Sequence, residues 1–142
     1  MNIKGIVTIK FIDRKTNKIV KKITSNNVML KNGAYCCLYG LTGLQSPNPI
    51  KKMVIFDTIS KQIICLDVTV TSYETPGCLF TASDHSNAIY NIFYLTLFPE
   101  NADYTSPENA YFACRLSSSY LKDDLVNAKI DWEIQISYNE PP

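Results

Sequence analysis

The side chains that could do chemistry are few, and their spacing argues against catalysis. Asp84, His85 and Ser86 stand in a row within SDHSN (residues 83–87). A Ser-His-Asp triad needs its members on separate elements that converge through hydrogen bonds, which three consecutive residues cannot arrange. Ser, Asp and Asn are also common turn residues. We therefore interpret this segment as a turn and expect no catalytic residues in it.

The cysteines are odd in number, two are adjacent, and none forms a C-x-x-C pair; they are Cys36, Cys37, Cys65, Cys78 and Cys114. A thiolate nucleophile would require Cys78 or Cys114 to meet His85 in space. However, Cys114 alternates with Phe112 and Leu116, which is the pattern of a strand's core face. We predict reduced, buried thiols that act as small hydrophobic side chains rather than a disulfide framework.

Metal and cofactor signals are also missing from the sequence. Asp123 and Asp124 are adjacent, and adjacent side chains on a strand or turn diverge, so they make a poor metal pair. The one histidine is far from any cysteine in the sequence. The five glycines are scattered and form no phosphate-binding motif. We expect a protein without catalytic residues, metal or cofactor.

Charge is unevenly distributed along the chain. The net charge is +1, yet residues 1–31 carry +7 and the rest carries −6. The candidate interface residues in this basic segment are Arg14, Lys15, Lys18, Lys21 and Lys22. They could be lysines that protect an edge hairpin, could steer copies head to tail, or could attract an anionic partner. A single Arg and the acidic remainder disfavour nucleic-acid binding.

Period-two alternation dominates the rest of the chain and predicts strands. The clearest case is NAKIDWEIQIS (residues 127–137), where Ile130, Trp132, Ile134 and Ile136 share one face. About eight such runs, without βαβ alternation, predict one domain over residues 1–142. We expect an antiparallel β-sandwich, jelly-roll or immunoglobulin-like, with Trp132 enclosed between its sheets. Gln62–Tyr73 is interpreted as one of the strands.

One segment changes to a helical period. Apolar positions in KNGAYCCLYGLTG (residues 31–43) predict a short helix near residues 32–42. We expect Asn32 to cap its start, and Gly40 or Gly43 to end it.

The loop at residues 99–109 contains the tetrapeptide PENA, which occurs at residues 99–102 and again at 107–110. Pro, Glu and Asn suit turns, so shared turn composition explains the repeat. Loops of this kind often carry binding surfaces. Tyr104 and Tyr111 are the aromatic candidates for contact with a partner or glycan, provided that they are exposed in a concave site.

Four stretches together resemble small structural proteins of tailed bacteriophage particles, of the tail, fibre or capsid-decoration type. In chain order they are VTIKFIDRKTNKIVKKITSNNVMLKNGAYCCLYGL, VTVTSYETPGCLFTASDHSNAIYNIFYLTLF, the loop after Phe98, and AYFACRLSSSYLKDDLVNAKIDWEIQI. Asn27 and Gly33 match the opening, and the residues that match the closing pattern are Arg115, Lys122, Trp132, Glu133 and Ile134.

This resemblance implies a non-enzymatic virion protein, made in the host cytoplasm, that contacts copies of itself and other virion proteins. Self-association would favour a closed homo-oligomer, because an open contact propagates into fibres. The other partner would be a capsid, collar or tail protein. A receptor- or glycan-binding module at a fibre tip is the alternative. No membrane partner is expected, because the most apolar stretch, residues 88–98, is too short to span a bilayer.

Overall fold

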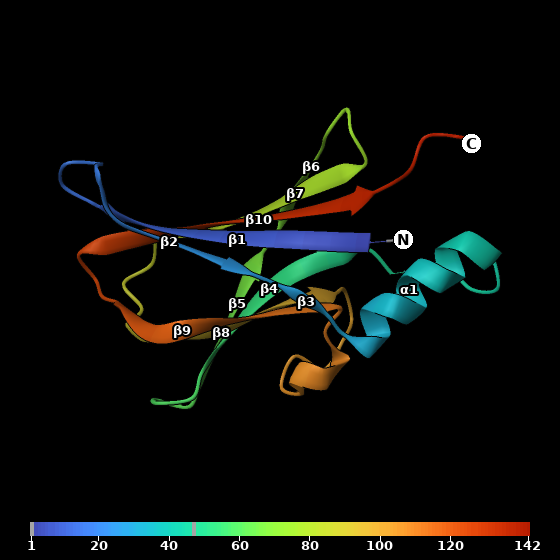
Figure 1. The fold of residues 1–142 in the computed structure, drawn as a ribbon. Helices are drawn as coiled ribbons and strands as arrows, with labels where there is room; N and C mark the ends of the chain where they lie inside the picture. The colour runs from blue at the N-terminus through green and yellow to red at the C-terminus, as the bar shows by residue number, and fades with distance from the viewer. Residues whose placement is uncertain (1, 47) are drawn as a thin grey trace.

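The protein is a two-layer β-sandwich with one helix at its end (Figure 1). The computed structural model describes residues 2–46 and 48–142. In the first sheet the strands lie in the order β2 (Ile19–Asn26), β1 (Asn2–Asp13), β10 (Val126–Ser137), β7 (Gly77–Asp84) and β6 (Thr69–Ser72). In the second sheet the order is β3 (Val28–Met29), β9 (Phe112–Lys122), β8 (Tyr90–Pro99), β4 (Ile50–Asp57) and β5 (Gln62–Asp67). All pairs are antiparallel, and the predicted sandwich is confirmed.

The described residues form ten strands rather than the eight expected, because the chain changes sheets inside two apparently continuous segments. The expected strand at residues 62–73 divides at Val68, so that β5 joins the second sheet and β6 the first. The Val68 amide donates to the Lys51 carbonyl at this corner. In the same way Asn27 separates β2 from β3. A one-residue crossing leaves the alternation of side chains nearly intact, so the sequence pattern does not show it.

Trp132 lies at the centre of the core, as predicted. Its side chain is fully buried, and its cross-strand partners are Val7 on β1 and Phe80 on β7. Burying Trp132, Ile130 and Ile134 contributes about 5–9 kcal/mol before conformational entropy is subtracted. The prediction was wrong for Ile136, which is exposed because the strand continues beyond the closely packed region.

A second apolar cluster covers the outer face of the second sheet. Phe56 and Phe98 are buried there, and the ring of Tyr104 meets Phe98 edge-on, with 5.3 Å between centroids. The segment after β8, which contains the 3-10 helix η1 (Pro107–Asn109), therefore folds back over this face. This explains why β4 is buried on both faces from Met53 to Asp57.

Helix α1 (Lys31–Thr42) projects beyond the end of the sandwich (Figure 1). Its N-cap residue is Leu30, which makes no side-chain cap, so the predicted cap at Asn32 was wrong. Gly43 ends the helix at φ 69°, and its amide donates to the Tyr39 carbonyl at 2.9 Å. Of the two predicted ends, Gly40 and Gly43, the structure therefore uses Gly43. Gly33 is the only buried residue of the helix.

Candidate functional site

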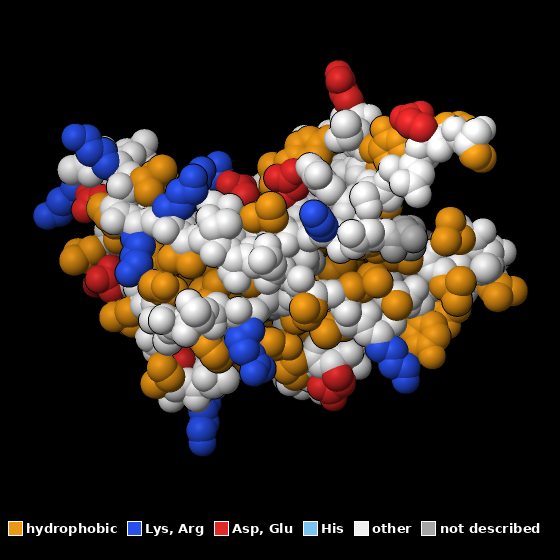
Figure 2. Space-filling model, in the orientation of Figure 1, with side chains coloured by type: hydrophobic (Ala, Val, Ile, Leu, Met, Phe, Trp, Pro, Cys, Tyr) orange, Lys and Arg blue, Asp and Glu red, His pale blue; other side chains and the backbone are white. Residues whose placement is uncertain are grey.

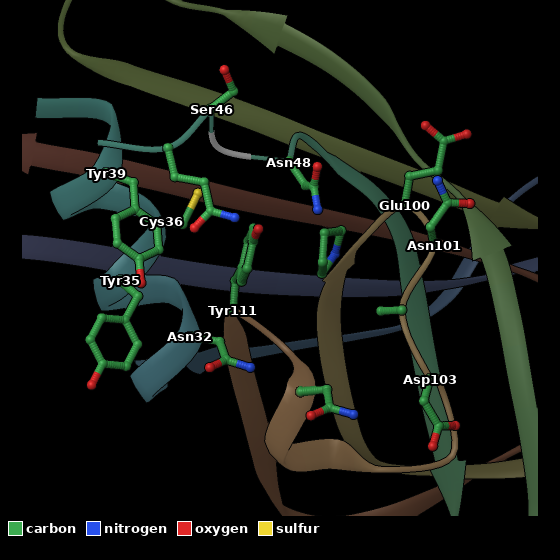
Figure 3. A pocket seen from close by; sticks show the side chains of 14 residues that line it. Asn32, Tyr35, Cys36, Tyr39, Ser46, Asn48, Glu100, Asn101, Asp103 and Tyr111 are labelled. Atoms are coloured by element: carbon green, nitrogen blue, oxygen red, sulfur yellow. The ribbon is translucent and has the colours of Figure 1, made fainter. Parts of the chain in front are cut away.

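A polar pocket of about 340 Å³ opens between α1 and the segment that follows β8 (Figure 3). Its walls come from the helix, from the segment between the helix and β4, and from both PENA copies. The residues that line it are Asn32, Tyr35, Cys36, Tyr39, Gln45, Ser46, Asn48, Pro99, Glu100, Asn101, Ala102, Asp103, Asn109 and Tyr111.

One face of α1 forms the helical wall of this pocket. Asn32, Tyr35, Cys36 and Tyr39 are spaced three and four residues apart, so they share one side of a helix. The rings of Tyr35 and Tyr39 stack, with 5.9 Å between centroids and 13° between planes. The local helical period therefore presents two aromatic rings and a carboxamide to the same space.

Tyr111 forms the floor of the pocket, and two backbone hydrogen bonds hold it in place. Its amide donates to the Leu97 carbonyl at 2.8 Å, and its carbonyl accepts from the Leu30 amide at 2.8 Å. Burial, together with hydrogen bonding to the Cys36 thiol, raises the pKa of Tyr111 to about 12. The phenol is therefore a neutral group at physiological pH, with its hydroxyl directed toward Asn48 (Figure 3).

The sequence interpretation required Tyr104 and Tyr111 to be exposed in one concave site, and neither ring is exposed. Tyr111 lines the pocket but is only 9% exposed. Tyr104 is half-buried against Phe98, outside the pocket lining. The sequence missed the helical residues of the site, although Asn32, Tyr35 and Tyr39 carried a signal in their spacing.

An apolar crevice of about 330 Å³ lies beneath α1, at the end of the core. Its lining residues are Gly33, Cys36, Cys37, Asn48, Pro49, Ile50, Phe80, Tyr111 and Phe112. The added methyl group of an alanine at Gly33 would collide with the Tyr111 carbonyl oxygen. Gly33 thus allows the close approach of the helix that shapes both hollows.

The outward side of α1 is apolar and uncovered. Leu38 is 49% exposed, Leu41 is 76% exposed, and Leu44, just after the helix, is 80% exposed. We call these three residues the α1 apolar face. Orange side chains mark this projecting part of the molecule in Figure 2. Three exposed leucines on one projecting element make a candidate interaction surface.

The basic candidates lie at the opposite end, around the β1–β2 turn (Figures 1 and 2). Arg14 is engaged within the chain, because its guanidinium donates to Asn127, Asn87 and the carbonyls of His85 and Ser86.

The four lysine candidates are all exposed. Lys21 lies 4.5 Å from the centroid of the Tyr120 ring. Lys15, Lys18 and Lys22 make no salt bridge within the described residues. Lys22, Lys10 and Lys129 occupy one cross-strand row of β2, β1 and β10. Like charges directly opposite each other repel, so this row would favour an anion.

The Asp84-His85-Ser86 segment ends β7 and begins the turn that leads to β8, and buried charged side chains hold this turn. Asp84 is buried and accepts from the Tyr90 hydroxyl at 2.7 Å and from the Ser86 amide at 2.8 Å. Lys122 is fully buried and donates to the carbonyls of Ser86, Ala88 and Asp123 at 2.9–3.1 Å. Burial lowers the pKa of Lys122, and the neighbouring Asp84 opposes that shift.

The cysteines are all free, but only Cys114 is buried. Cys65 is exposed, which contradicts the predicted burial, because it points outward from the edge strand β5. Cys36, Cys37 and Cys78 are half-buried. Residues 2–46 and 48–142 contain no group of three or more His, Cys, Asp and Glu placed to hold a metal.

The pocket's geometry suits binding, since its lining combines stacked rings with polar side chains.

Comparison with known proteins adds no relative. No protein-family model, curated protein or solved structure matches the chain. In the part of the chain that the structure describes, no helix has the length and apolar character that crossing a membrane would require.

Proposed function

We propose that this protein is a non-enzymatic structural component of a bacteriophage particle that self-associates and docks on a capsid, collar or tail protein. The observation that carries the proposal is the α1 apolar face, which no part of the described chain covers. The sequence resemblance set out above supplies the particle context.

Helix packing explains why this face favours association. An isolated 12-residue helix is marginally stable in water, so α1 depends on tertiary contacts. Only Gly33 is buried by those contacts, while Leu38 and Leu41 face outward. Burying each leucine against another chain would contribute about 1.5–3 kcal/mol.

A closed arrangement fits the shape of the molecule. Two copies that pair through α1 would place the same patch against itself, as a two-fold interface requires. The sandwiches would then point away from each other, because α1 lies at one end of the molecule (Figure 1). The basic β1–β2 end would remain free for a second virion partner.

Leu41→Glu tests self-association, because it places a charge in the centre of the apolar face. We expect light scattering of the purified protein to show an oligomer for the natural sequence and a smaller species for this variant. Leu125→Glu is the control, since Leu125 is 62% exposed in the turn at the far end. A natural protein that is monomeric at all concentrations, or an oligomer insensitive to Leu41→Glu, would refute the role of α1.

Mass spectrometry of purified phage particles tests the virion assignment itself. We expect the protein to be found in intact particles after nuclease and salt washing, at a copy number that matches a symmetric substructure. Its presence only in the soluble lysate would refute the assignment, whatever its oligomeric state.

A further inference from the structure

We propose that the pocket between α1 and the segment after β8 binds a neutral oligosaccharide. This inference goes beyond the proposed structural role, because it assigns a ligand class to a site that self-association through the α1 apolar face does not use.

The pocket is lined by five carboxamide side chains, which is its most unusual feature. They are Asn32, Gln45, Asn48, Asn101 and Asn109. None of them makes a side-chain hydrogen bond to another residue in the described part of the chain. Each carboxamide offers two donors and an acceptor. A sugar hydroxyl both donates and accepts, so a row of vicinal hydroxyls complements these groups.

Four carboxamides elsewhere in the chain hold the fold together. Asn127 and Asn87 accept hydrogen bonds from Arg14, Asn91 donates to Asp57, and Gln62 donates to Ser60 and to the Ile89 carbonyl. Asn2, Asn17, Asn26 and Asn27 also make no side-chain hydrogen bond in the described part of the chain, but they are spread over β1, β2 and the turns beside them. The pocket differs because five such side chains converge on one space, which points to an external ligand.

The two PENA copies explain how separated positions converge here. Asn101 belongs to the first copy and Asn109 to the second, and both line the pocket. Asn101 adopts a positive φ of 60°, and η1 turns the chain back before Asn109. The segment thereby presents the same residue type twice to one space, opposite Asn32 on α1.

The aromatic rings supply the other half of the recognition. Tyr35 and Tyr39 stack, and Tyr111 closes the floor (Figure 3). The ring faces of tyrosine offer apolar area for the C–H faces of a pyranose, while the phenol hydroxyls can hydrogen-bond. A volume of about 340 Å³ lies within the range of ligand pockets, about 300–1,000 Å³.

Charge in the pocket selects against anionic sugars. The ionic side chains of the lining are Glu100 and Asp103, while the Lys31 ammonium lies outside the lining, 5.8 Å from the centroid of the Tyr35 ring. The Asp103 carboxylate already accepts a hydrogen bond of 2.6 Å from the Thr105 hydroxyl. Carboxylates accept hydrogen bonds from neutral hydroxyls and repel phosphate or uronate groups, so the ligand should be uncharged.

The saccharide site and the α1 apolar face occupy different sides of the same helix. Asn32, Tyr35 and Tyr39 face the pocket, whereas Leu38 and Leu41 are exposed away from the pocket lining. Substitutions can therefore separate the two activities, and failure of one proposal does not decide the other.

The test is binding of the full-length protein to an array of bacterial surface oligosaccharides, neutral and anionic, followed by titration calorimetry with the best neutral probe. The variants are Asn32→Ala combined with Asn48→Ala, and Tyr39→Ala. Tyr138→Ala is the matched control, since Tyr138 is 65% exposed outside the pocket. Leu41→Glu reports on self-association, and circular dichroism verifies the fold of each variant.

We expect the natural protein to bind at least one neutral oligosaccharide, with the carboxamide double variant and Tyr39→Ala each weakening it about tenfold or more. Tyr138→Ala and Leu41→Glu should leave the affinity per chain unchanged. Absence of binding to every neutral probe would overturn the proposal. So would binding that both pocket variants retain, or binding restricted to anionic probes.

Discussion

Individual charged side chains hold turns of the sandwich in place through hydrogen bonds. Asp57 is 2% exposed, and its carboxylate accepts from the amides of Ile59, Ser60 and Asn91 and from the Ser60 hydroxyl. It thereby ties the β4–β5 turn to the start of β8. The half-buried Arg14 and the buried Lys122 act in the same way on the connection between β7 and β8, through the carbonyl oxygens of residues 85, 86 and 88.

Asp57 gives the fold a dependence on acid. Burial alone would raise its pKa, but hydrogen bonds from Ser60, Asn91 and Ile59 outweigh burial and lower the pKa to about 2. Because the folded pKa lies below the unfolded value of 3.8, the stabilisation is present above pH 4 and is lost as pH falls toward 2.

Asp57→Asn should therefore remove this acid dependence. We expect the natural protein to lose about 2 kcal/mol of unfolding free energy from this group between pH 5 and pH 2, and the variant to lose correspondingly less. Urea unfolding at several pH values measures the difference. Asp124→Asn, at an exposed position, is the control and should follow the natural protein. If Asp57→Asn and the natural chain lost the same unfolding free energy between pH 5 and pH 2, this account would be contradicted.

At the scale of the element, α1 is unusual because its sequence fits three environments at once. One side lines the polar pocket, Gly33 contacts the strand end at Tyr111, and the leucines face solvent. A typical amphipathic helix would bury its apolar stripe on its own core. Here close packing is concentrated at one glycine.

Gly33→Ala should displace α1 from the sandwich. The added methyl group meets the Tyr111 backbone, which is fixed by strand hydrogen bonds, so we expect a loss of about 1–3 kcal/mol in unfolding free energy. Amide chemical-shift changes should spread from residue 33 to residues 109–112.

Gly43→Ala is the comparison for this experiment. Its position has open space but a φ of 69°, so its cost of about 1–2 kcal/mol should come from the backbone alone and leave the signals of residues 109–112 unchanged. Equal spectral effects of the two variants would show that Gly33 has no special packing role.

At the scale of the whole molecule, one core joins the two sheets. Trp132 and Ile130 from the first sheet and Ile55 and Leu95 from the second belong to the same buried cluster. Sandwiches built this way depend on contacts between residues distant in sequence, so neither sheet can retain its buried face without the other.

Unfolding should therefore be a single cooperative transition. Trp132 is the chain's only tryptophan, so its fluorescence reports on the core alone, whereas far-ultraviolet circular dichroism reports on all strands. We expect the two signals to change at the same urea concentration. A fluorescence midpoint clearly separated from the dichroism midpoint would contradict a shared core.

The sequence by itself determined the local features of this fold. Strict alternation in residues 127–137 placed Trp132 inside, and the change of period after Leu30 located the helix and narrowed its end to Gly40 or Gly43, of which the structure uses Gly43. These inferences succeeded because the period of side chains along a strand or helix is a local property.

The tertiary structure alone decided the sheet changes at Asn27 and Val68, the use of Arg14 as an internal clamp, and the pocket. Each depends on which distant segments meet. Asn32, Asn48 and Asn109 look like ordinary loop and cap residues until the strands bring their segments to the same end of the sandwich. Their shared environment arises from long-range strand pairing, which leaves no period in the residues themselves.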